Sequence, residues 1–131
     1  MYDLKVIQAM NSQLAETASE IKTERDTTPR YVQVNIGRNI GDVPMPEYDW
    51  ALFQGAVAVE IFYAAYDESD PLAANIHTGS GQWGDVREES AYISYFAENG
   101  IDLASLRKGL EAIKTRFNQD AIALITSSEL I

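Results

Sequence analysis

The stretch HTGSGQWGDVREES, residues 77–90, gathers several side chains that could do chemistry. It holds the only histidine of the chain, His77, together with Trp83 and Arg87. An indole beside a guanidinium is suited to stacking on a planar ligand and to holding its charge. A plain hairpin explains the same stretch if Trp83 packs on its own sheet, so both interpretations stay open.

The acid and base candidates in this stretch do not form a catalytic pair. Glu88 and Glu89 are neighbours, and adjacent side chains on a strand point to opposite faces. Arg87 and Glu89 share a face, and we expect a salt bridge between them. His77 could act as a general base, but the sequence places no nucleophile or acid beside it. Nucleophile, dinucleotide and kinase motifs are absent, so we predict no catalytic residue.

A second candidate is the loop GRNIGDVP, residues 37–44. Arg38 can pair with an anion, Asn39 can hydrogen-bond to it, and a helix start follows a few residues later. A loop that needs glycine only for its turn is the alternative. If the strands that carry Arg38 and Arg87 are neighbours, both guanidiniums lie at one end of the sheet. We therefore predict a site for a small anionic ligand, such as a nucleotide, formed by Arg38, Asn39, Trp83 and Arg87.

Length and composition narrow the classes of function. The chain has 131 residues, 20 acidic and 10 basic, with a net charge of -10 and no cysteine. One domain is expected at this length. Without cysteine and with one histidine, thiol catalysis and the common zinc sites are excluded. A cation site made of carboxylates alone stays open, but we predict no metal and no other cofactor. The acidic balance disfavours DNA as a partner and leaves a basic protein as an alternative one.

No signal for a membrane or for export is visible. A basic segment followed by an apolar run is missing at the N-terminus, and no later apolar run reaches membrane-spanning length. We therefore expect a soluble, cytoplasmic protein.

Residues 1–26 predict an N-terminal helix. Apolar residues recur there at steps of three and four, with Asn11 completing the series: Leu4, Ile7, Leu14, Ala18 and Ile21. Such a heptad pattern is typical of a helix that pairs with a second copy, and a polar residue in the seam can fix the register. We expect either an oligomerisation arm, and hence a homo-oligomer, or a helix packed on its own domain.

Residues 30–131 predict a single α+β domain. Alternation predicts a strand over YVQVNIGRN, and helical spacing predicts a helix from about Pro46 to Ala65, although residues 56–66 also favour a strand. LAANIHT and EESAYISYF predict two more strands, with Gly79, Ser80 and Gly81 in the turn between them. Asp102 can cap a helix that ends near Phe117, and AIALITS predicts the last strand.

The order strand, helix, strand, strand, helix, strand is that of the ferredoxin-like fold, an antiparallel sheet with two helices on one face. The polar side of the first strand, Tyr31, Gln33 and Asn35, is then expected on the face that the helices leave uncovered. That face is either solvated, covered by the N-terminal helix or paired with another subunit.

These patterns resemble a known family. The motifs are a strand ending in Ile36-Gly37-Arg38, a helix with Trp50 and Phe53, the turn Gly81-Gln82-Trp83 followed by Arg87-Glu88-Glu89-Ser90, and a last helix ending at Phe117. Over residues 31–126 the chain resembles short bacterial and phage proteins of unknown function with a ferredoxin-like fold. The resemblance implies that fold. Phage domains of similar type include oligomeric sponges that inhibit bacterial defence by sequestering nucleotide signals.

Three functions follow as hypotheses. The first is a non-enzymatic, oligomeric binding module for a small anionic ligand. The second is an acidic protein that docks on a basic partner and inhibits it. The third is a small-molecule enzyme on a ferredoxin-like sheet, which would use His77, Tyr92 or a carboxylate.

Overall fold

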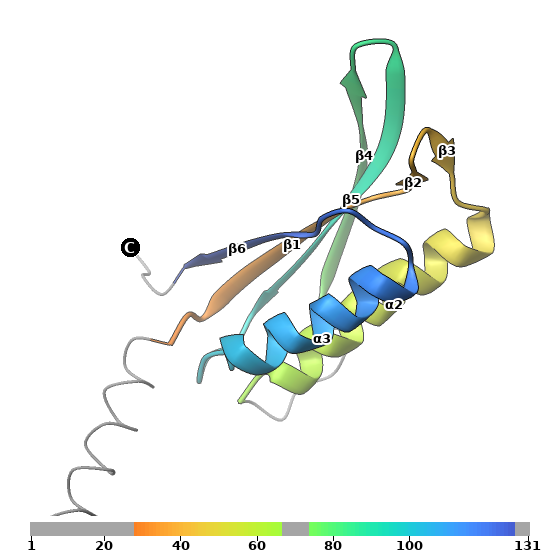
Figure 1. Cartoon of the computed structure of the whole chain (residues 1–131). Coiled ribbons are helices and arrows are strands. Elements are labelled where there is room, and N and C mark those ends of the chain that lie inside the picture. Colours follow the sequence, from red (N-terminus) through yellow and green to blue (C-terminus); the bar gives the residue numbers. More distant parts are fainter. Residues whose placement is uncertain (1–27, 67–73, 128–131) are drawn as a thin grey trace, which may run out of the picture.

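The computed structural model describes residues 28–66 and 74–127, which form a four-stranded antiparallel sheet with two helices (Figure 1). The strands of the main sheet are β1 (Tyr31–Gly37), β4 (Asn75–Trp83), β5 (Val86–Phe96) and β6 (Ala123–Ser127). The helices are α2 (Glu47–Ala64) and α3 (Leu103–Arg116). A short hairpin of β2 (Asn39–Ile40) and β3 (Val43–Pro44) joins β1 to α2.

The sheet has the strand order β4-β5-β1-β6, so β1 and β5 are its two central strands. Their register pairs Tyr31 with Phe96 at one end and Gly37 with Ser90 at the other. Figure 1 shows α2 and α3 side by side on one side of the sheet, while the β4–β5 hairpin projects beyond the end of β1. The prediction that the first and third strands are central neighbours is confirmed.

The core lies between the helices and one face of the central strands. Val32, Val34 and Ile36 of β1 are buried, and the residues between them are only half buried. Ala91 and Ile93 of β5 are buried on the same face. The alternation predicted for the first strand is therefore correct, and the polar face of β1 is the one that the helices leave uncovered.

Of residues 56–66, which fitted both a helix and a strand, residues 56–64 belong to α2. The buried side chains of this helix recur at helical spacing: Trp50, Phe53, Val57, Ala58, Ile61 and Ala64. Phe53 has no exposed surface and stacks on Phe117, with ring centroids 4.8 Å apart. Burial of this stripe thus outweighs the strand propensity of the valines and aromatic residues.

Local chemistry sets both ends of α3, and the sequence predicted the cap at its start. Asp102 caps the helix, because its side chain accepts a hydrogen bond of 3.1 Å from the backbone N–H of Ser105. Asn118 has a φ of 53°, the left-handed conformation that commonly ends a helix.

The predicted turn between β4 and β5 is wrong in position. Gly79, Ser80 and Gly81 lie inside β4, and the turn is Gly84-Asp85, because Trp83 pairs directly with Val86. Two-residue hairpin turns need positive φ angles, and Gly84 supplies one of 60°.

Two predictions fall on residues that the structure leaves undescribed. The N-terminal helix, residues 1–26, lies outside the described residues, as do Leu72 and Ala73 at the start of the predicted second strand. Within the described part of the chain, neither helix combines the length and the apolar character needed to cross a membrane.

Phe53→Ala should lower the free energy of unfolding by about 3 to 5 kcal/mol, because it leaves a cavity beside Phe117. Urea unfolding followed by circular dichroism measures this loss. Phe96→Ala is the matched control, since Phe96 is 47% exposed, and it should cost about 1 kcal/mol or less. Equal losses in the two variants would contradict the assigned core.

Candidate functional site on the uncovered face of the sheet

The uncovered face of the sheet presents its side chains in rows across the strands. One row joins His77 of β4, Tyr92 of β5 and Asn35 of β1, which are direct cross-strand partners. Tyr92 is 41% exposed and His77 is also exposed. The row therefore places an aromatic ring, an imidazole and an amide where a ligand can reach them.

The next rows, toward the hairpin, are poor in side chains. Gly79 and Gly37 are the partners of Ser90 on its two sides. Gly81 is the partner of Glu88 in β4. Ser90 and Glu88 thus have no competing side chain opposite them on β4, and backbone is exposed beside them.

Glu88 is the titratable group that stands out on this face. Its carboxylate lies across Gly37, so that a Cβ atom added at Gly37 would collide with its Oε1. The side chain is half buried, and it forms no ion pair or hydrogen bond with another described residue. Burial raises the pKa of the Glu88 carboxyl above its ordinary value. A carboxylate in this state gains from a cationic or hydrogen-donating ligand.

A chain of hydrogen bonds runs along β1 toward Glu88. Tyr31 donates from its hydroxyl to Oε1 of Gln33 at 3.1 Å, and Gln33 donates from Nε2 to Oδ1 of Asn35 at 2.9 Å. The amide nitrogen of Asn35 has no partner among the described residues. The hydrogen bonds thus hold the amide oxygen of Asn35 and leave its amide nitrogen available to a ligand.

Arg38, which the sequence assigned to an anion site, is held by groups of the protein itself. Its Nη1 lies 2.9 Å from Oε2 of Glu89 and 3.2 Å from Oε2 of Glu47, and its Nε donates to the carbonyl of Met45 at 2.8 Å. The hydrogen bond with Glu89 raises the pKa of Arg38 further above that of an ordinary guanidinium. The expected salt bridge between Arg87 and Glu89 is therefore wrong, because Glu89 pairs with Arg38.

The other three predicted ligand residues lie in different surroundings. Asn39 is buried, and its carbonyl accepts a hydrogen bond of 3.2 Å from Nε2 of Gln119. Arg87 is exposed, and its Nη2 lies 3.5 Å from the hydroxyl of Ser80. Trp83 is the last residue of β4.

The structure brings Arg38 and Arg87 to the same end of the sheet, since the N–H of Arg38 donates to the carbonyl of Glu89. A ligand at Arg38 would share its guanidinium with two carboxylates. The anion site formed by the four predicted residues stays a prediction.

Glu88 and Asn35 were missed as site residues, although their signal is present in the sequence. The alternation of β5 puts Glu88 on the same face as Tyr92, and that of β1 puts Asn35 and Gly37 on the polar face. What the sequence did not supply is the register that joins these strands.

Among the described residues, no group of three or more His, Cys, Asp or Glu side chains could hold a metal ion.

No protein-family model matches the sequence, and no curated protein matches it. Among solved structures, the chain is similar to a phage SAM lyase in complex with S-methyl-5'-thioadenosine, with 16% identity and a TM-score of 0.51 over 75% of this chain and 79% of that chain. A phage SAM lyase in the apo state aligns with 18% identity and a TM-score of 0.42 over 77% and 91% of the two chains. A de novo designed protein, Foldit4, aligns with 11% identity and a TM-score of 0.37 over 76% of this chain and 94% of that chain. The first of these likenesses shows a shared fold.

Gly37→Ala should lower the pKa of Glu88 toward its ordinary value, because the added methyl group displaces the carboxylate into solvent. A carboxyl-detected NMR titration measures this pKa. Gly79→Ala is the control on the same face, since a Cβ there meets only the hydroxyl of Ser90 at an ordinary 3.8 Å. A pKa of Glu88 that stays raised in Gly37→Ala would show that the carboxylate does not lie over Gly37.

Proposed function

We propose that the chain adopts the ferredoxin-like fold and binds an S-adenosyl sulfonium compound on the uncovered face of its sheet. Glu88 is the observation that carries this proposal. A half-buried carboxylate with a raised pKa and no partner among the described residues is stabilised by a ligand that brings a positive charge to it. The sulfonium centre of S-adenosylmethionine is such a charge.

The charge of the whole chain supports a cationic ligand over an anionic one. A net charge of -10 attracts cations to the surface and repels anions at long range. The two carboxylates beside Arg38 offset the positive charge that an anion would need. The geometry therefore favours the Glu88 side of the sheet over the Arg38 side.

Groups farther along the same face suit the adenosine part of such a ligand. Tyr92 exposes a ring on which a purine can stack, and the donors of Asn35 can reach its ring nitrogens or the ribose. Gly79 and Gly81 leave room above β4 for a flat group.

The fold likeness supports the same class of ligand. The similar phage SAM lyase is in complex with S-methyl-5'-thioadenosine, an adenosine thioether without the sulfonium charge. His77 and Tyr92 lie on the same face, two rows along the sheet from Glu88, and are groups that can act as acid or base, so cleavage of the sulfonium compound belongs to the same hypothesis. Membership of a family of short bacterial and phage proteins is part of the hypothesis too.

Glu88→Gln should weaken the binding of S-adenosylmethionine by about 10- to 100-fold, because it removes a charge-assisted contact. Binding of S-methyl-5'-thioadenosine, which is neutral at sulfur, should change little. Isothermal titration calorimetry measures both affinities. In the wild type, S-adenosylmethionine binding should fall as the pH drops through the pKa of Glu88, which lies above that of an ordinary glutamate. Protonation removes the negative charge that the sulfonium needs.

Glu98→Gln is the charge-matched control, since Glu98 is exposed in the loop after β5. Chromatography of the incubated ligand shows whether the thioether is released and so separates binding from cleavage. Equal affinities of the Glu88→Gln variant and the wild type, or no binding of either compound, would refute the proposal.

A small anion at Arg87 is the second candidate, because the exposed guanidinium of Arg87 has, among the residues that the structure describes, only the 3.5 Å contact with Ser80. An oligomeric module that sequesters an anionic nucleotide would use this end of the sheet.

Arg87→Ala should then abolish the binding of ATP, measured by calorimetry, without changing the melting temperature. Arg38→Ala should lower the melting temperature in addition, because it removes two ion pairs and the bond to Met45. ATP binding that survives Arg87→Ala would exclude this candidate.

A further inference from the structure

The outward face of α2 is apolar, unlike the solvent-facing side of an ordinary surface helix. Tyr48 is 74% exposed and Tyr63 is 73% exposed, and Leu52 and Val59 between them are each exposed by about two-fifths. Exposed aromatic and aliphatic side chains that follow one helix for most of its length indicate a surface that another element covers.

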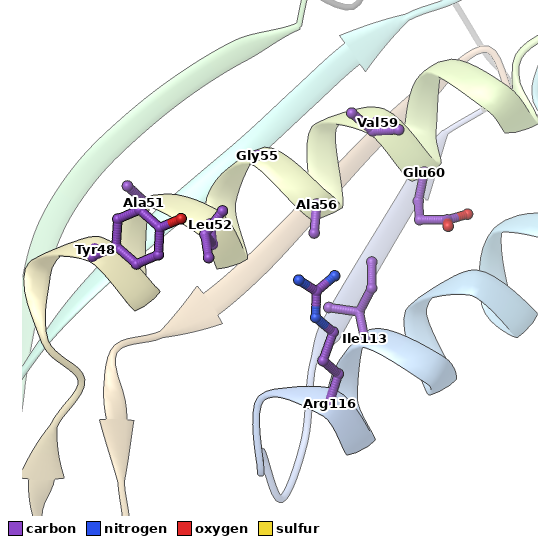
Figure 2. A pocket seen from close by; sticks show the side chains of 9 residues that line it. All are labelled: Tyr48, Ala51, Leu52, Gly55, Ala56, Val59, Glu60, Ile113 and Arg116. Atoms are coloured by element: carbon purple, nitrogen blue, oxygen red, sulfur yellow. The ribbon is translucent and has the colours of Figure 1, made fainter.

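A groove runs between this face and α3 (Figure 2). Its volume is about 520 Å³, and most of the surface that lines it is apolar. Ala51, Gly55 and Ala56 have small side chains and form the floor of the groove on the α2 side. Glu60 and Arg116 provide charge at its edges. Small residues in the floor and large ones at the rim suit an apolar helix laid along α2.

The chain enters the domain at one end of this groove. The carbonyl of Pro29 accepts a hydrogen bond of 2.9 Å from the N–H of Ile101. The N–H of Asp102 donates to the carbonyl of Ala64, the last residue of α2, at 2.8 Å. Thr28, the first described residue, therefore lies near the C-terminal end of α2.

We propose that residues 4–21 form a helix that lies in this groove of the same chain, parallel to α2. The apolar seam of this segment and α2 each span 18 residues, about 27 Å at 1.5 Å per residue. Residues 22–27 reach up to about 20 Å when extended, which is enough to bring Ile21 beside Tyr63. Leu14 then lies opposite the low floor formed by Gly55 and Ala56.

The same chain is favoured over a second copy because of this short connection. A tethered segment meets its groove at an effective concentration of the order of millimolar, which a separate copy does not match at ordinary protein concentrations. The apolar residues of segment 4–21 then cover the groove of their own domain, and the heptad spacing reflects packing within one chain.

A single cysteine tests the proposal, because the chain has none of its own. Gly55→Cys is suitable, since a Cβ at Gly55 meets no atom within 4 Å. In the full-length chain, maleimide labelling of this thiol should be about tenfold or more slower than in the same chain carrying Leu14→Asp, because burying the introduced carboxylate opposes docking. Ser12→Asp, which adds the same charge on the other side of the predicted helix, should leave the slow rate unchanged.

Ala51→Cys provides a second thiol in the same groove, and circular dichroism checks that each variant is folded. Protection that does not depend on protein concentration supports packing within one chain. Protection that grows with concentration would assign the groove to a second copy and overturn the proposal. Equal labelling rates of the introduced thiol with and without Leu14→Asp would overturn the proposal as well.

Discussion

The pairing of β1 with β5 is the constraint on which the rest of the structure depends. Seven pairs from Tyr31 with Phe96 to Gly37 with Ser90 fix which side chains enter the core and which lie on the uncovered face. A slip of β1 by one residue would turn its buried side chains Val32, Val34 and Ile36 to solvent, at a cost of several buried aliphatic groups. The core therefore enforces the register, and the register in turn sets Glu88 over Gly37. Burial of the core side chains on one face of these strands therefore fixes the positions of the site residues on the other face.

At the end of β1, the contacts of Arg38 fix the position of the helix α2 relative to the sheet. One guanidinium contacts Glu89 of β5, Glu47 at the start of α2 and the carbonyl of Met45 between them. The backbone of Arg38 also accepts a hydrogen bond from the N–H of Met45 and donates another to the carbonyl of Glu89. A cation surrounded in this way aligns the start of α2 with the base of the hairpin. That structural role also explains why an arginine in a glycine-containing loop resembles an anion site when only the sequence is seen.

Much of the fold follows from local patterns, whereas the site depends on pairs of residues that are far apart in the sequence. The alternation of β1, the stripe of α2 and the cap at Asp102 are each visible within a few residues, and each was predicted correctly. The turn was misplaced because Gly79 and Gly81 in a strand interior look like turn residues, while the positive φ of Gly84 is what the hairpin uses. The contacts of Glu88 with Gly37 and of Arg38 with Glu89 join residues 51 positions apart. No spacing rule predicts them, because they depend on strand register.

The two faces that the core leaves open differ in chemistry, and this difference separates their roles. The uncovered sheet face combines a carboxylate, oriented amides and an exposed ring, groups that recognise a small polar ligand by direction and charge. The outer face of α2 carries apolar side chains, which recognise a complementary apolar surface by the area that they bury. A helix laid on α2 would bury that surface without touching the uncovered face of the sheet, because α2 and that face lie on opposite sides of the sheet (Figure 1). Covering α2 can therefore stabilise the domain while the candidate site stays open to its ligand.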